Sequence, residues 1–210
     1  MHVKKGCGLP GLSSLWAPEV MAGERGPLLL LTLSLGLASA QKTLEEVPVQ
    51  SGFDAQKVEG RWLTIQLATS HTHLVSPEDP LRLALHSIWT RDRDLEFVLF
   101  WTGEGVCKGV NITVHPTGLQ GQYQGSFEGG GSMFIRFVST DYRSLILYVW
   151  FEDAGEVTSL LALLARRVFG DPKWLGKYQK YIREFQLQEA PAFNLDAQCS
   201  PPTAYARANS

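Results

Sequence analysis

The sequence predicts an all-β fold: an eight-stranded antiparallel up-and-down barrel with one C-terminal α-helix packed outside it. Two patterns support this prediction. Between Arg61 and Arg167, short apolar runs alternate with turn residues, which is typical of an antiparallel sandwich or barrel. After Gly170, apolar residues recur at helical spacing instead. Eight consecutive strands protect their edges most economically by closing into a barrel, and such a barrel is just wide enough to hold one small ligand.

Recognisable turn and loop signals separate the expected strands. The polar segment 71–80, with two prolines, predicts a long loop, and Asp92–Asp94 predicts a hairpin turn. His86 interrupts the apolar alternation of the second strand, which indicates a β-bulge. The glycine-rich segment 128–131 lacks the strand-to-helix context of a phosphate-binding loop and is interpreted as a hairpin turn. The expected strands cover residues 61–70, 81–90, 95–101, 105–115, 121–127, 133–138, 144–151 and 157–167.

The helix is predicted from its start signal and its apolar stripe. Asp171 is an expected N-cap, and Pro172 occupies the first helical position. An apolar stripe indicates packing against the barrel, although a helix lying on a membrane surface would show the same pattern. The stripe consists of Trp174, Leu175, Tyr178, Tyr181, Ile182 and Phe185.

The amino-terminal segment has the features of a secretory leader. Leu28–Leu37 is apolar but too short to span a bilayer, and Ala38-Ser39-Ala40 is the small-x-small pattern of a signal-peptidase site. We therefore expect residues 1–40 to be a signal peptide with an N-terminal extension, Met21 being an alternative start. We expect residues 41–200 to form a single domain and residues 201–210 to be a disordered tail. The mature protein is expected to be secreted and extracellular, without stable membrane insertion.

Charge and cysteine content agree with an extracellular domain. The chain has a formal net charge of −2, so no basic face for nucleic acid is expected. Cleavage leaves Cys107 and Cys199, which in an oxidising compartment most simply form a disulfide. The sequon Asn111-Ile112-Thr113 predicts glycosylation of Asn111. Strand alternation places Ile112 on one face and both Cys107 and Asn111 on the other, which is therefore expected to lie outside the barrel.

Gly60 and Trp62 open the first strand, and Arg166 ends the last one. An indole at that position can plug one end of the barrel, and Gly60 allows the chain to cross closely beneath it. The indole face also offers a platform for a guanidinium, for which Arg166 is the candidate.

The chain resembles the lipocalin family, which shares the calycin barrel. Gly60-Arg61-Trp62 resembles the first family signature, Thr140-Asp141-Tyr142 the second and Arg166 the third, in the expected order. Cys107 and Cys199 match the bridge common in the family. The runs FDAQKVEGRWLTIQLATS and PLRLALHSI are similar to the branch of kernel lipocalins that holds major urinary proteins, beta-lactoglobulin and glycodelin.

This resemblance implies a carrier that binds a small hydrophobic molecule, of the odorant, pheromone, retinoid or fatty-acid type, in the barrel lumen. Strand alternation indicates independently many of the same inward-facing positions. No cofactor is expected. The residues expected to line the pocket are Leu81, Leu83, Leu85, Ile88, Leu95, Phe97, Leu99, Ile112, Tyr123, Phe127, Ile135, Tyr148, Trp150, Leu160 and Leu164.

Other interpretations of the same residues remain open. Large side chains could fill the lumen completely, leaving a core and no pocket. A few lipocalins are isomerases that use a pocket cysteine, but both mature cysteines of this chain are assigned to the bridge, so no enzyme activity is expected. His71 and His73 are too few ligands for a metal site. A secreted glycoprotein whose outer surface binds a cell-surface receptor is the alternative to transport, with Asn111 as its support.

Overall fold

The computed structural model describes residues 42–71, 84–103, 106–126, 131–168 and 171–190. Outside these residues lie the segments expected to be a signal peptide and a disordered tail, most of the expected 71–80 loop and most of the expected glycine-rich turn. The elements are η1 (Leu44–Glu46), η2 (Ala55–Val58), β1 (Gly60–Arg61), β2 (Leu63–Thr69), β3 (Ala84–Arg91), β4 (Asp94–Gly103), β5 (Val106–Pro116), β6 (Gln122–Ser126), β7 (Ser132–Thr140), β8 (Ser144–Asp153), β9 (Glu156–Ala165), α1 (Pro172–Phe185) and β10 (Gln188–Glu189).

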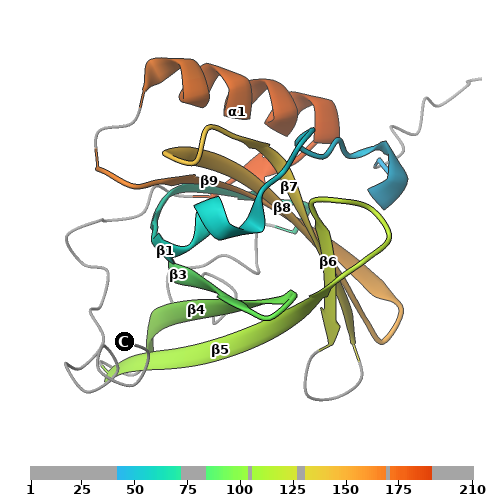
Figure 1. The fold of residues 1–210 in the computed structure, drawn as a ribbon. Coiled ribbons are helices and arrows are strands. Elements are labelled where there is room, and N and C mark those ends of the chain that lie inside the picture. Colours follow the sequence, from blue (N-terminus) through green and yellow to red (C-terminus); the bar gives the residue numbers. More distant parts are fainter. Residues whose placement is uncertain (1–41, 72–83, 104–105, 127–130, 169–170, 191–210) are drawn as a thin grey trace, which may run out of the picture. The chain divides into compact units, whose positions relative to one another are not determined.

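The strands form a closed antiparallel barrel, which confirms the predicted fold (Figure 1). Closure depends on a break in the first expected strand at Trp62. The part before the break, β1, pairs with β3, and the part after it, β2, pairs with β9. Each remaining strand from β3 to β9 pairs with its neighbour in sequence. The first strand therefore joins both edges of the sheet, so neither is left unpaired.

Three strand pairs contain a register shift that bends the barrel. One lies between Leu85 and Ser87 on β3, which confirms the bulge expected at His86. The others lie between Thr64 and Gln66 on β2 and between Phe137 and Ser139 on β7. The short strand β10 pairs with the end of β2 and was not expected from the sequence.

Trp62 and Arg166 seal the barrel end where β2 begins and β9 finishes. Trp62 is 1 % exposed, and its Nε1 donates to the carbonyl oxygen of Val58 at 2.7 Å. The guanidinium carbon of Arg166 lies 3.8 Å from the indole centroid, which confirms the expected stacking. Gly60 has a φ of +94°, and a Cβ there would lie 3.4 Å from Arg166 Nη1. Glycine is needed for this backbone conformation, whereas the space beside it would just admit a Cβ in contact with Arg166.

The second signature, Thr140 to Tyr142, forms the turn between β7 and β8. Asp141 accepts hydrogen bonds from two backbone amides of this turn and, at 3.2 Å, from the indole Nε1 of Trp174 on α1. The hydroxyl of Tyr142 accepts a hydrogen bond from the backbone amide of Asp54 at 3.0 Å. The turn therefore holds both the helix and the segment before β1 in place.

Helix α1 packs against the outside of the barrel across β7, β8 and β9 (Figure 1). Its predicted N-cap is confirmed, since the Asp171 side chain accepts from the backbone amide of Lys173 at 2.9 Å. Its buried side chains are Trp174, Tyr178, Ile182 and Phe185. Leu175 is 42 % exposed, so its assignment to the buried stripe was wrong. No helix in the described ranges has the length and apolar character needed to cross a bilayer.

The apolar residues therefore form two layers. One fills part of the barrel interior, and the other lies between the outer face of the barrel and α1. Strand β8 serves both: Leu145 and Leu147 belong to the inner layer, whereas Ile146 and Tyr148 belong to the outer one. Both faces of β8 are therefore buried, and both carry apolar side chains.

Candidate ligand-binding site

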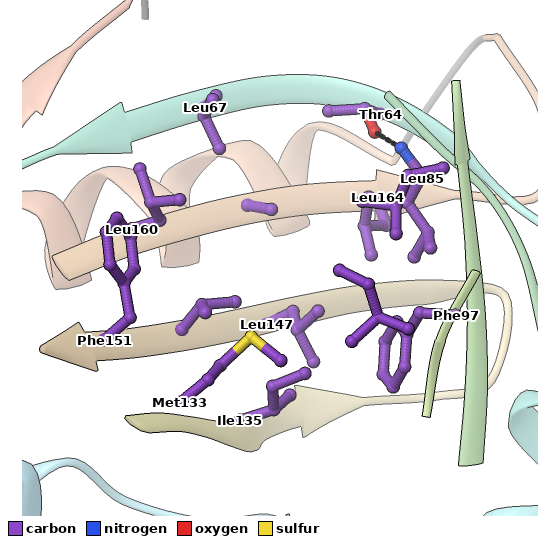
Figure 2. A pocket seen from close by; sticks show the side chains of 14 residues that line it. Thr64, Leu67, Leu85, Phe97, Met133, Ile135, Leu147, Phe151, Leu160 and Leu164 are labelled. Atoms are coloured by element: carbon purple, nitrogen blue, oxygen red, sulfur yellow. Dashed lines mark hydrogen bonds between the residues drawn. The ribbon is translucent and has the colours of Figure 1, made fainter. Parts of the chain in front are cut away.

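The barrel interior contains a partly open cavity of about 100 Å³ (Figure 2). Side chains from β2, β3, β4, β5, β7, β8 and β9 point into it, so it belongs to the closed barrel as a whole. The lining residues within the described part of the chain are Thr64, Leu67, Leu85, Phe97, Leu99, Ile112, Met133, Ile135, Leu147, Val149, Phe151, Leu160, Ala162 and Leu164.

The cavity wall is almost entirely apolar. None of the lining side chains named above carries a charge, and Thr64 is the one with a hydroxyl group. That hydroxyl accepts a hydrogen bond from the backbone amide of Leu85 at 3.0 Å (Figure 2). Because burying an unpaired charge is costly, this wall suits an uncharged apolar molecule.

The structure brings about half of the predicted pocket residues together around this cavity. Ile88, Leu95 and Tyr123 are also buried in the barrel interior, but they belong to the packed core and do not line the cavity. Leu81, Leu83 and Phe127 lie outside the described residues. The predicted residues that do line the cavity are Leu85, Phe97, Leu99, Ile112, Ile135, Leu160 and Leu164.

Tyr148 and Trp150 do not face the lumen, so their prediction as pocket residues is corrected. Tyr148 is 1 % exposed beneath α1, where its ring meets Phe185 at a centroid distance of 5.6 Å. Trp150 also packs against the outer layer. The prediction chose the wrong face of β8. Both faces of this strand are apolar, so alternation alone did not show which one points into the barrel. The lumen-facing residues of β8 are Leu147, Val149 and Phe151.

Pairing information could have corrected this error. Ile135 was expected inside, and its directly opposite partner on β8 is Val149, which must face the same side of the sheet. Half of the lining residues were not predicted from the sequence. These are Thr64, Leu67, Met133, Leu147, Val149, Phe151 and Ala162. Thr64 and Ala162 gave no signal because small or polar residues are usual on the outer face of a barrel strand.

A cluster of aromatic rings lies within the barrel core beside the cavity. Phe97, which lines the cavity, lies 6.3 Å from Phe137, and Phe137 stacks on Phe53 at 4.2 Å between centroids. Tyr123 meets the edge of the same cluster at 5.8 Å from Phe137. Burial raises the pKa of Tyr123, because desolvation disfavours the phenolate. Tyr123 therefore stays protonated and acts as a packing residue.

The predicted outward-facing residues of β5 lie on the outer face. Asn111 is exposed, and its Nδ2 donates to Glu96 Oε1 at 2.6 Å. Cys107 is disulfide-bonded, whereas its expected partner, Cys199, lies outside the described residues, so that pairing stays a prediction. His71 approaches the carbonyl oxygen of Val157 at 3.1 Å. Within the ranges that the structure covers, no group of three or more histidine, cysteine or carboxylate side chains suits a metal ion.

Comparisons with known proteins agree with the fold. The family model described as lipocalin / cytosolic fatty-acid binding protein family matches residues 59–197. Uterocalin from Equus caballus is 24 % identical over 157 residues, which is 74 % of this chain and 86 % of that protein. Minor allergen Can f 2 from Canis lupus familiaris is 28 % identical over 166 residues, 77 % of this chain and 89 % of that protein.

A solved structure extends the likeness to three dimensions. The deswapped triple mutant of bovine odorant binding protein superimposes with a TM-score of 0.59 at 19 % identity, covering 70 % of this chain and 99 % of that one. The family match agrees with the closed barrel, the Trp62–Arg166 seal and the external helix. This chain therefore belongs to the lipocalin / cytosolic fatty-acid binding protein family.

Proposed function

We propose that this protein is a secreted, non-enzymatic carrier that binds a small, uncharged hydrophobic molecule inside the barrel. The observation that supports this function is the apolar cavity of about 100 Å³ inside the barrel. Its wall offers burial and shape, and the polar group of Thr64 is already hydrogen-bonded to the backbone. Membership of the lipocalin family and the likeness to bovine odorant binding protein support the same function.

The cavity volume favours a compact ligand. An engineered apolar cavity of ~150 Å³ holds benzene, whereas drug-sized ligands need roughly 300 Å³ or more. A compact odorant of about one ring therefore fits this barrel better than a retinoid or a long-chain fatty acid. Each buried methylene contributes ~0.8 kcal/mol, so a one-ring ligand of about ten carbons, such as thymol, gains roughly 8 kcal/mol before ordering costs. We expect dissociation constants of about 10 to 100 μM.

Titration calorimetry with thymol, retinol and palmitate tests this function. Thymol should bind the wild type most tightly. Leu85→Arg should abolish thymol binding because it places an unpaired charge in the cavity wall, while the volume-conserving control Leu85→Met should retain it. The carrier function fails if the wild type binds none of the three, or if a folded Leu85→Arg variant binds thymol as well as the wild type does.

Secretion and glycosylation form a separate part of the proposal. The exposed side chain of Asn111 lies on the outer face of the barrel, so a glycan there would leave the cavity free. The receptor-binding alternative rests on this asparagine alone, and we therefore favour transport. N-terminal sequencing of material secreted by cultured cells should begin at Gln41, and glycosidase treatment should lower its mass. Retention of residues 1–40 in secreted material would contradict the leader assignment.

A further inference from the structure

We propose a second binding site, on the outside of the barrel, that takes a small amphipathic anion such as an aromatic carboxylate. The site is a groove of about 470 Å³ between residues 42–45 and the outer faces of β6 to β9. We call it the outer groove and define it by Glu45, Gln122, Phe134, Arg136 and Trp150. It is separate from the lumen, because Phe134 and Arg136 alternate along β7 with the cavity residues Met133 and Ile135.

Arg136 gives the groove a cation that is nearly withdrawn from water. The residue is only 6 % exposed. Its Nε donates to Gln122 Oε1 at 2.5 Å, and its Nη1 donates to the carbonyl oxygens of Glu45 and Val47. These neutral acceptors hold the guanidinium in place but do not neutralise it. Across the described residues, no carboxylate lies within ion-pair distance of Arg136.

One nitrogen of this guanidinium remains available. Nη2 of Arg136 has no hydrogen-bond partner within the described ranges. It is not a buried orphan either, since the one buried side-chain atom without a partner there is Gln66 Oε1. Nη2 therefore reaches solvent, and the space that Arg136 borders is the outer groove. A fixed, desolvated guanidinium with a free N–H edge is well suited to bind a carboxylate.

The apolar wall beside Arg136 explains why the ligand should be amphipathic. Phe134 and Trp150 are direct cross-strand partners on β7 and β8. Their ring centroids lie 5.7 Å apart with an interplanar angle of 55°, so together they offer an aromatic surface next to the cation. A flat apolar body can pack on this surface while its carboxylate reaches Nη2. A simple inorganic anion would leave the aromatic surface unused.

Two charged side chains near the outer groove determine how a substitution there should change the affinity for a carboxylate. Lys42 also borders the groove, but its Nζ pairs with Glu184 at 2.7 Å. Glu45 is the nearby carboxylate that interacts electrostatically with Arg136, although burial dominates and lowers the pKa of Arg136. Glu45 is exposed. A bound carboxylate would be repelled by Glu45, so removal of that charge should strengthen binding.

Nuclear magnetic resonance on the secreted protein, with 2-naphthoate and its uncharged analogue 2-naphthamide, tests the outer groove. The Ala162→Phe background places a phenyl ring in the lumen and keeps this test independent of the proposed carrier function. Titration with 2-naphthoate should shift the indole signal of Trp150 and the Nε signal of Arg136 to saturation. 2-Naphthamide should bind at least about fivefold more weakly, since it lacks the charge.

Two substitutions should move 2-naphthoate affinity in opposite directions. Arg136→Gln should weaken binding about tenfold and bring it to the level of 2-naphthamide. Glu45→Gln should strengthen 2-naphthoate binding about twofold and leave 2-naphthamide unchanged, whereas Glu189→Gln, an exposed glutamate outside the groove, should change neither. If Arg136→Gln fails to fold, the Glu45→Gln comparison decides the question. Equal binding of both probes, or no shift at Trp150, would overturn the proposal.

Discussion

Arg166 combines two stabilising roles in one side chain. Its guanidinium stacks on Trp62 and also donates to the carbonyl oxygens of Lys57, Glu59, Arg61 and Tyr142. A stacked cation contributes ~0.5 to 2 kcal/mol, and each hydrogen bond contributes roughly 0.5 to 1.5 kcal/mol. The four hydrogen bonds together therefore contribute more to the free energy of unfolding than the stacking does. They also join the segment before β1 to the turn after β7.

Arg166→Ala should destabilise the protein without altering its ligand preference. We expect a loss of about 2 to 3 kcal/mol, which lowers Tm by roughly 5 to 10 °C in a domain of this size. Arg166→Lys should recover little, because an ammonium cannot reach four carbonyl oxygens in a planar arrangement. Differential scanning calorimetry together with thymol titration measures both effects. Lost affinity at unchanged Tm would show that Arg166 acts on the ligand and not on the fold.

His86 should make stability depend on pH. Partial burial lowers its pKa, and the positive charge of Arg61 lowers it further. Between this lowered pKa and the unfolded value of about 6.5, the unfolded chain binds more protons than the native protein. The free energy of unfolding should therefore fall as pH drops from about 7 towards 5. Urea denaturation across this range should show a smaller loss for His86→Gln than for the wild type, and equal losses would refute the assignment.

At the scale of the elements, β8 contributes apolar side chains both to the barrel interior and to the contact with α1. Its inner residues Leu147 and Val149 border the cavity, and its outer residue Tyr148 supports α1. The hydroxyl of Tyr148 donates to Ser159 Oγ on β9 at 2.8 Å, so the outer face is fixed by a hydrogen bond as well as by packing. Neighbouring residues on this strand therefore have separable effects on stability and on binding.

A pair of adjacent substitutions tests that separation. Tyr148→Leu should lower the free energy of unfolding by about 1 to 3 kcal/mol, because it removes the contact with Phe185 and the hydrogen bond to Ser159. It should leave thymol affinity unchanged. Val149→Phe should weaken thymol binding and leave the free energy of unfolding nearly unchanged, since the larger side chain enters the cavity. Urea denaturation and calorimetry on both variants measure this, and loss of thymol binding in Tyr148→Leu would contradict the assigned faces.

At the scale of the whole molecule, the predicted bridge between Cys107 and Cys199 ties the C-terminal segment to β5. It would close a loop of about ninety residues, for which chain-entropy reasoning gives ~4.6 kcal/mol. The double variant Cys107→Ser/Cys199→Ser should therefore lose roughly that much stability in urea denaturation. Non-reducing peptide mapping of the secreted protein identifies the partner of Cys107 directly. Two free thiols at these positions would rule the bridge out.

Local patterns in the sequence were enough to predict the barrel and its sealed end. Alternation along each strand, turn residues between strands and an N-cap before the helix are short-range features, so each could be read without the others. The positions of Gly60, Trp62 and Arg166 predicted a stacked seal because an indole face can hold a guanidinium and glycine lets the chain cross closely beneath it. Seven of the expected pocket residues also line the cavity. On β5 only one face is consistently apolar, so alternation was enough to place Ile112. Strand β9 is apolar on both faces, so alternation alone did not decide which face of it points inward.

The tertiary structure alone decided the phase of β8, the size of the cavity and the outer groove. The phase of β8 depended on which face met the helix, because both faces are apolar. Cavity volume is the small remainder after side chains from seven strands fill the barrel, and no single strand determines it. The outer groove depends on Arg136 reaching the carbonyl oxygen of Val47, 89 residues earlier in the chain. Such a site forms only when distant segments pack together, so no local pattern could have revealed it.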